Sequence, residues 1–183
     1  MNKKRVFPLV CLLLAGTAQA DENAVASSPK SACMEGPLAQ FGRYIGDWKI
    51  TDEELEKDGS SWSPGDGARW TFVCVGDGLG VQDYWMPNTG GFGTNLRIYN
   101  PDTESWEIVW AATPKKGFTH ISAKQNDQGD IVMDFVSPKP NPPRRITFFA
   151  PEDAGWKWVM EMSFDEGESW TPVYRISATP WDS

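Results

Sequence analysis

Short segments of alternating apolar and polar residues, separated by turns, occupy most of the chain after residue 46. Trp106, Ile108 and Trp110 share one face of such a segment, and Glu107 lies on the other. The segment 156–162 alternates in the same way. A two-residue period with charge on one face indicates half-buried antiparallel strands.

The pattern predicts ten strands. The first begins at Trp48, and the others span 68–75, 79–86, 94–99, 106–112, 117–124, 130–136, 144–150, 156–164 and 170–178. The connections carry Gly, Asp, Asn and Pro, and no helical pattern intervenes, as is typical of an all-β protein. A meander of ten strands protects its two edges by closing, so we expect a single closed antiparallel β-barrel.

The N-terminal region divides into three predicted parts. Residues 1–20 form a signal peptide, with a basic start, a short apolar stretch and an Ala-Gln-Ala cleavage site that ends at Ala20. Residues 21–36 are expected to be a flexible linker. Pro37 opens a short helical pattern that ends at Gly46, and residues 37–183 form the barrel domain.

Export and charge limit the partners. Cys11 lies inside the apolar stretch of the leader rather than after a lipidation signal, so no membrane anchor is expected, and the protein should be periplasmic or secreted. Three of the 17 basic residues belong to the leader, which leaves 14 against 25 acidic residues. This acidity disfavours nucleic acid and anionic membranes as partners.

The two cysteines beyond the leader, Cys33 and Cys74, form an even pair. In an oxidising compartment such a pair reads as one disulfide, with two free buried thiols as the alternative. Two distant cysteines and a single histidine make a poor zinc site, so no metal is expected.

Aromatic residues at alternate strand positions are the strongest chemical signal. They could line an apolar pocket with polar tips, or they could fill the barrel. The candidate aromatic lining residues are Trp85, Trp110, Trp158 and Tyr174. The acidic loop 52–67 is placed to cover a barrel mouth.

Three polar residues are further candidates. Asp83 shares its face with Val81 and Trp85, which favours an inward carboxylate, and with Arg97 it could form a polar cluster in the cavity. His120 is the only histidine and could serve as an axial haem ligand or lie at the surface. No cofactor is expected otherwise, and no serine-hydrolase elbow is present.

The order of Gly46-Asp47-Trp48, Gly93 to Pro101 and Trp106 to Trp110 resembles the lipocalin and calycin superfamily, and within it a bacterial lipocalin-like family of unknown function. The resemblance implies that Trp48 packs across the closed end of the barrel and that Arg175, in the last strand, covers it. It also implies binding of a small apolar or amphipathic molecule.

The segment Ser163 to Trp170 fits the Asp-box pattern S-x-D-x-G-x-[ST]-W. One such box cannot build a propeller, so Asp165, Gly167 and Trp170 are expected to shape a hairpin. The sequence therefore predicts an exported ligand-binding barrel. A barrel lyase or isomerase that uses Asp83 and Arg97, and an interaction module with a filled barrel, are the alternatives.

Overall fold

The computed structural model describes residues 27–152 and 155–181. The predicted signal peptide lies outside these residues. Ten of the described strands form the barrel wall: β2 (Gly46–Leu55), β4 (Ala68–Val75), β5 (Gly80–Pro87), β6 (Gly93–Asn100), β7 (Ser105–Ala112), β8 (Phe118–Gln125), β9 (Ile131–Ser137), β10 (Arg144–Phe148), β11 (Trp156–Met162) and β12 (Thr171–Pro180). From β4 to β12, each strand pairs with the next in antiparallel fashion.

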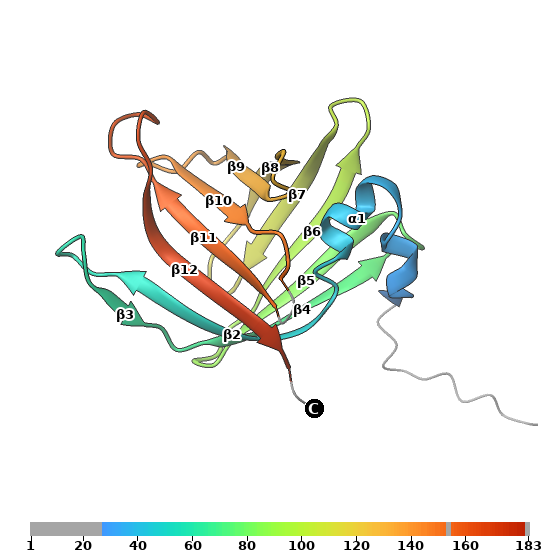
Figure 1. Ribbon diagram of the computed structural model, residues 1–183, viewed down its shortest axis with the longest axis horizontal. Coiled ribbons are helices and arrows are strands. Elements are labelled where there is room, and N and C mark those ends of the chain that lie inside the picture. Colours follow the sequence, from blue (N-terminus) through green and yellow to red (C-terminus); the bar gives the residue numbers. More distant parts are fainter. Residues whose placement is uncertain (1–26, 153–154, 182–183) are drawn as a thin grey trace, which may run out of the picture.

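Strand β2 closes the barrel. Its first half pairs with β4, in the register Trp48↔Trp70, and it also pairs with β12, in the register Trp48↔Pro180. The predicted closed antiparallel meander is confirmed. Figure 1 shows β2 running beside β12, so that the start and the end of the chain's barrel segment meet.

Two short strands extend this sheet beyond the predicted ten. Strand β3 (Trp62–Pro64) pairs with the far half of β2, so the predicted loop 52–67 contains a β-hairpin. Strand β1 (Ser27–Ser28) pairs with the end of β4. The described part of the segment expected to be a flexible linker is therefore structured: β1 is followed by the 3-10 helix η1 (Lys30–Cys33).

Cys33 lies in η1 and forms a disulfide with Cys74 of β4, with 5.8 Å between the two Cα atoms. Both cysteines are buried. The bond fixes the segment before the barrel to the barrel wall, which explains why this polar stretch adopts a defined position.

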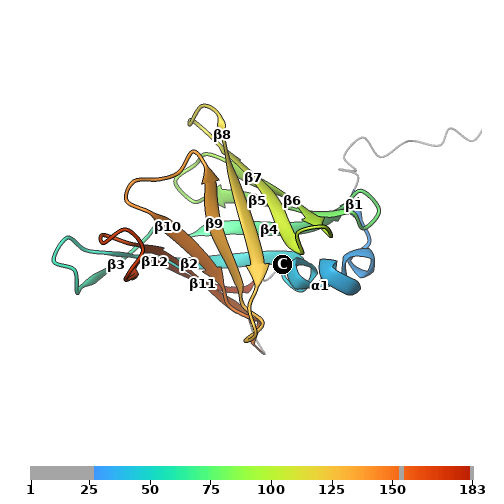
Figure 2. The ribbon, with the colours of Figure 1, turned by 90° about the horizontal axis from the view of Figure 1, so that it is seen from above.

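A short helical segment plugs one end of the barrel. It consists of the 3-10 helix η2 (Gly36–Leu38) and helix α1 (Ala39–Gly42). Phe41 is fully buried, and its ring meets that of Trp106 edge-on at 4.9 Å between centroids. In Figures 1 and 2, α1 and the β2–β3 hairpin lie at opposite sides of the view.

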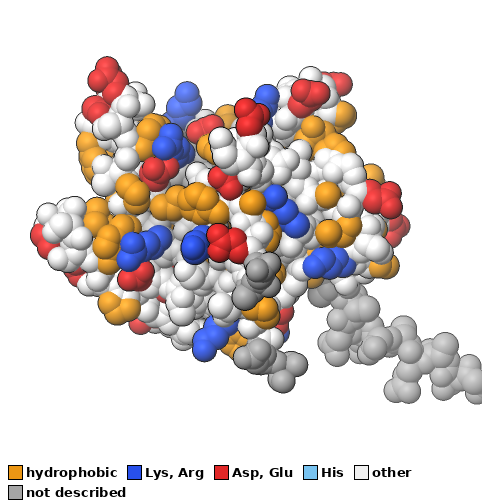
Figure 3. All heavy atoms as spheres, in the orientation of Figure 1, with side chains coloured by type: hydrophobic (Ala, Val, Ile, Leu, Met, Phe, Trp, Pro, Cys, Tyr) orange, Lys and Arg blue, Asp and Glu red, His pale blue; other side chains and the backbone are white. Residues whose placement is uncertain are grey.

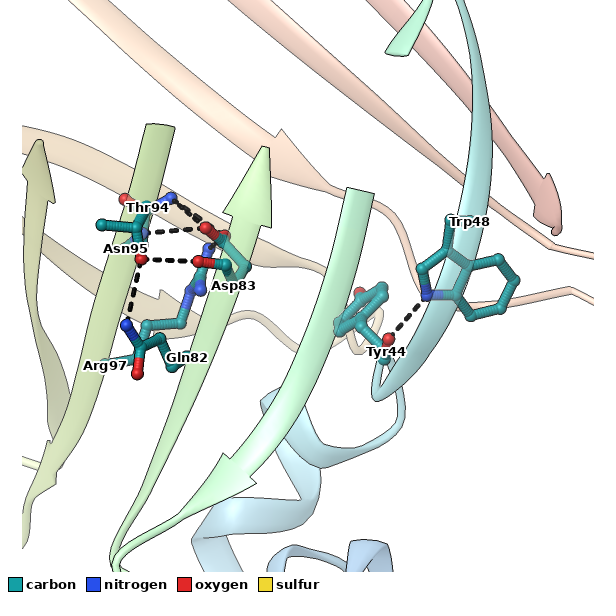
Figure 4. Close-up of polar contacts among 7 residues, drawn as sticks. All are labelled: Tyr44, Trp48, Gln82, Asp83, Thr94, Asn95 and Arg97. Atoms are coloured by element: carbon teal, nitrogen blue, oxygen red, sulfur yellow. Dashed lines mark hydrogen bonds and ion pairs between the residues drawn. The ribbon is translucent and has the colours of Figure 1, made fainter. Parts of the chain in front are cut away.

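The G-x-W segment lies at this closed end. The Trp48 indole Nε1 donates to the Tyr44 carbonyl at 2.8 Å, as Figure 4 shows, and its ring meets Trp156 edge-on. Tyr44 is also fully buried, and its hydroxyl donates to the Phe149 carbonyl at 2.8 Å. Aromatic packing therefore seals the floor of the barrel.

No helix in the described part of the chain has the length and the apolar character that a membrane span requires. On the face drawn in Figure 3, acidic, basic and apolar side chains are interspersed rather than gathered into one patch of a single sign.

Candidate ligand site

A cavity of about 360 Å³ occupies the barrel interior above the aromatic floor. This volume falls within the range of small-molecule sites. Its aromatic lining comes from seven strands and comprises Trp70, Trp85, Trp110, Phe135, Phe148, Trp158 and Tyr174. The structure thus brings together the four aromatic residues that the sequence proposed, and adds three more.

The aromatic walls are held by contacts between rings. Trp70 and Trp85 meet edge-on at 5.0 Å, and Trp158 and Tyr174 do so at 5.7 Å. Such pairs have defined geometry, so the walls present a preformed apolar surface rather than a loose one.

Asp83 of β5 and Asn95 and Arg97 of β6 form a polar cluster, and the two β6 residues line the cavity. Arg97 Nη2 donates to Asp83 Oδ2 at 2.6 Å, and both side chains are fully buried. The Asn95 backbone N–H donates to Asp83 Oδ1 at 2.8 Å, and Asn95 Nδ2 donates to Oδ2 at 2.9 Å. Figure 4 shows these three side chains pointing toward one another.

Arg97 is also surrounded by rings. Its guanidinium carbon lies 4.8 Å from the centroid of Phe41 and 5.1 Å from that of Phe72. Nε and Nη1 of Arg97 have no hydrogen-bond partner among the described residues. Cation–π contacts therefore take the place of the hydrogen bonds that these nitrogen atoms lack.

Strand β6 reverses the usual pattern of polarity. Asn95 and Arg97 point inward and are buried, whereas Leu96 and Ile98 are 41% and 51% exposed. The register places Arg97 opposite Ile108, a core residue of β7. The polar residues of this strand therefore face the interior.

Two further cations line the cavity: Lys115, in the loop between β7 and β8, and Arg144, the first residue of β10. Sequence reasoning missed both. The period of β10 could have indicated Arg144, because Arg144 shares a face with the buried residues Ile146 and Phe148.

Tyr174, which lines the cavity, is hydrogen-bonded to Asp52 of β2, which is not one of the lining residues. Its hydroxyl donates to Asp52 Oδ2 at 2.5 Å. Burial, followed by the hydrogen bond and the negative charge of Asp52, raises the pKa of Tyr174 well above its ordinary value. Tyr174 therefore keeps its proton and acts as a fixed donor to Asp52.

His120 does not reach the cavity. It lies on the outer face of β8, where Nε2 is 2.5 Å from Glu107 Oε2, and its side chain is 38% exposed. The strand alternates, and its buried neighbours Thr119 and Ile121 are the residues that line the cavity. The proposed axial haem ligand is thus placed outside the site.

Arg175 also differs from the expectation. Its Nε donates to Glu53 Oε2 at 2.7 Å, and its guanidinium carbon lies 4.1 Å from the ring centroid of Trp62. This places Arg175 on the outer face beside β3, away from Trp48. The unpredicted β3 supplies the aromatic ring that Arg175 covers.

The Asp-box segment forms the hairpin between β11 and β12. Asp165 Oδ1 accepts from the Ser169 N–H at 2.8 Å, and Gly167 has a φ of 104°. Hydrogen bonds from Ser169 lower the pKa of Asp165 to about 2. The ring centroid of Trp170 lies 4.5 Å from the guanidinium carbon of Arg145. None of Asp165, Gly167 and Trp170 is among the residues that line the cavity.

A larger hollow, of about 900 Å³, lies on the outer face of β2, β10, β11 and β12. Both of its arginines already have partners, since Arg145 pairs with Glu161 and Arg175 pairs with Glu53. Its one lysine, Lys157, has no ion pair among the described residues. The interior cavity is smaller, but its walls are aromatic, and its lining residues Lys115 and Arg144 form no ion pair within the described part of the chain. It is therefore the better candidate site.

Comparison with known proteins supports the fold. No family model and no curated protein matches the chain. Among solved structures, it is similar to an S-type phycobiliprotein lyase from Guillardia theta. The match has a TM-score of 0.55 and 8% identity, and covers 84% of this chain and 97% of the lyase. At this identity the likeness shows the fold alone, a closed antiparallel β-barrel that fits the expected lipocalin-like architecture. The bacterial family of unknown function stays a prediction.

Proposed function

We propose that this protein is an exported carrier or receptor of a small apolar or amphipathic molecule, which binds inside the barrel. The observation that carries the proposal is the cavity of about 360 Å³ with seven aromatic lining residues. Apolar walls with a few convergent polar groups are the usual composition of a small-molecule site. The disulfide accords with an oxidising compartment.

The enzyme alternative has less support. Asp83 is the only inward carboxylate that the sequence proposed as an acid or base, and both of its oxygen atoms accept hydrogen bonds from Asn95 or Arg97. A general base needs a free lone pair within reach of the substrate. The similar solved structure is described as a lyase, so this fold is compatible with an enzyme, but the likeness does not assign an activity to this protein.

The filled-barrel alternative predicts no cavity, and the volume above the floor argues against it. The chain offers a sharp test of the interior. Met160 lines the cavity, whereas Val159, its neighbour on β11, lies on the outer face. Met160→Trp should fill the cavity, and Val159→Trp adds the same side chain outside.

The neutral fluorescent probe N-phenylnaphthylamine can measure binding by titration. We expect the unmodified protein and Val159→Trp to bind it alike, and Met160→Trp to bind it at least about tenfold more weakly. Equal binding by the two variants would place the probe outside the barrel and overturn the proposal.

Native mass spectrometry of protein purified from its own source gives a second readout. A co-purified small molecule that is lost on denaturation would give the ligand class. The same spectrum reports the mature mass, which should correspond to cleavage after Ala20, and the loss of two hydrogens at the disulfide. A mature mass that includes the leader would overturn the export part of the proposal.

A further inference from the structure

The charge of the cavity lining is opposite to that of the chain. The sequence has 25 acidic and 17 basic residues. Among the described residues that line the cavity, however, three are cationic, namely Arg97, Lys115 and Arg144, and none is a carboxylate. Asp83 neutralises Arg97. Two cations therefore remain without a carboxylate at the wall.

Arg144 is the better defined of the two. It occupies an inward position of β10 and pairs in register with Met162 of β11, so its cross-strand neighbour is apolar. Its Nε atom is buried and has no hydrogen-bond partner among the described residues. A buried donor without an acceptor costs stability unless a ligand supplies one.

Arg145, the next residue of β10, has a carboxylate partner, in contrast to Arg144. Arg145 faces outward, and its Nε donates to Glu161 Oε2 at 2.6 Å. On the same strand, the protein therefore provides the outward arginine with a carboxylate and leaves the inward one without. Lys115 lies in an exposed loop, and its side chain lines the same cavity.

We propose that the ligand is an amphipathic anion, whose carboxylate or similar oxyanion group is bound by Arg144 and Lys115. Its apolar body lies among the tryptophans of the walls, principally Trp85, Trp110 and Trp158. This inference rests on the proposed function and specifies its ligand class. Hydrogen bonds between ionised groups are strong, and they gain further in a site with apolar walls.

A matched pair of fluorescent probes tests the charge. Anilinonaphthalene sulfonate and N-phenylnaphthylamine share one aromatic skeleton, and only the first carries a sulfonate. We expect the folded protein to bind the sulfonate at least about tenfold more tightly than the neutral probe, as two charge-assisted contacts would produce. Added salt should reduce this preference.

Variants with adjacent controls test the residues. Arg144→Gln and Lys115→Gln should each reduce the affinity for the sulfonate severalfold and leave the affinity for the neutral probe unchanged. Arg145→Gln and Lys116→Gln remove the same charges from neighbouring positions and should change neither affinity. Far- and near-ultraviolet circular dichroism establishes that each variant is folded, and Lys115→Gln, in an exposed loop, keeps the test available if Arg144→Gln does not fold.

The outcomes separate the two proposals. If neither probe binds the folded protein, the proposed function fails and the anion inference fails with it. If the neutral probe binds inside the barrel but the sulfonate has no advantage, only the anion inference is overturned. A preference for the sulfonate that survives in both Arg144→Gln and Lys115→Gln would overturn the assignment of these two residues.

Discussion

Asp83 of β5 and Arg97 of β6 form a fully buried ion pair, with 2.6 Å between Oδ2 and Nη2. Neighbouring groups satisfy the carboxylate completely, since Asn95 donates to both of its oxygen atoms. Burying two charges is costly, and here the hydrogen bonds to the carboxylate and the cation–π contacts of the guanidinium offset that cost. The pair therefore organises the lower barrel and the base of the cavity.

We predict that Arg97→Met destabilises the protein by about 3–5 kcal/mol, because it leaves the Asp83 carboxylate buried without a counter-charge. The double variant Asp83→Leu with Arg97→Met should recover part of this loss. Urea unfolding measures both. Arg175→Met removes an exposed arginine paired with Glu53 and serves as the control, with little change expected. A loss for Arg97→Met as small as that of the control would contradict the structural role of the pair.

The disulfide provides a second prediction. Cys33 and Cys74 are 41 residues apart in sequence. In the chain-entropy account, closing a loop of this length stabilises a protein by about 4 kcal/mol. The double variant Cys33→Ala with Cys74→Ala should unfold at lower urea concentration by a corresponding amount, and a reductant should destabilise only the unmodified protein. If a reductant lowers the stability of the unmodified protein and of the double variant equally, the loss does not come from breaking this disulfide.

Because the Tyr44 hydroxyl is buried, we predict that the protein loses stability in alkali. Burial is the main cause that raises the pKa of Tyr44 from 10.0 to about 12. Between pH 10 and about pH 12, the Tyr44 phenol therefore keeps its proton in the folded state and has lost it in the unfolded state. The contribution is complete below pH 10 and is lost as the pH rises toward 12.

The free energy of unfolding, measured from about pH 9 to about pH 12, should fall less steeply for Tyr44→Phe than for the unmodified protein. The variant should also be less stable at neutral pH by about 1 kcal/mol, since it loses the hydrogen bond to the Phe149 carbonyl. Tyr84→Phe, whose ring packs against Phe92 rather than in the barrel floor, is the control for removal of a phenol hydroxyl. An unchanged slope in Tyr44→Phe would show that other groups cause the alkaline loss.

Gly93 makes room for a wall of the cavity. A Cβ atom at this position would overlap the Trp110 ring. We predict that Gly93→Ala displaces Trp110, costs about 1–3 kcal/mol in stability and weakens binding of the neutral probe. In a protein that already carries Trp110→Leu, Gly93→Ala should reduce stability much less, because the ring that the Cβ atom would overlap is absent. Additive effects of the two changes would argue against this contact.

Much of the fold follows from the sequence by local rules. Strand positions agree closely with the alternating segments, as in 68–75 for β4, because turn residues and a two-residue period leave few other structures open. The strands that escaped prediction, β1 and β3, are two and three residues long. Segments of this length carry no detectable period, and each is held by pairing with a strand distant in sequence.

The candidate site is less predictable than the fold. Aromatic alternation selected Trp85, Trp110, Trp158 and Tyr174, since large apolar side chains at alternate positions define an inward face. The same rule identifies the wrong inward face for β6, because the apolar residues Leu96 and Ile98 of this strand are exposed. It also missed Lys115, because a loop residue has no face to assign.

The sequence by itself determined the meander of strands, because periodicity and turn chemistry are local properties. It also singled out Cys33 and Cys74 as the candidate disulfide pair, and the structure decided between that bond and two free thiols. Only the tertiary structure decided that Arg97 lies inside beside Asp83, that His120 and Arg175 lie outside, and that Arg144 lines a cavity. These placements depend on strand register and barrel closure. Both are set by contacts between residues that are remote in the chain, and the sequence of a single strand does not contain them.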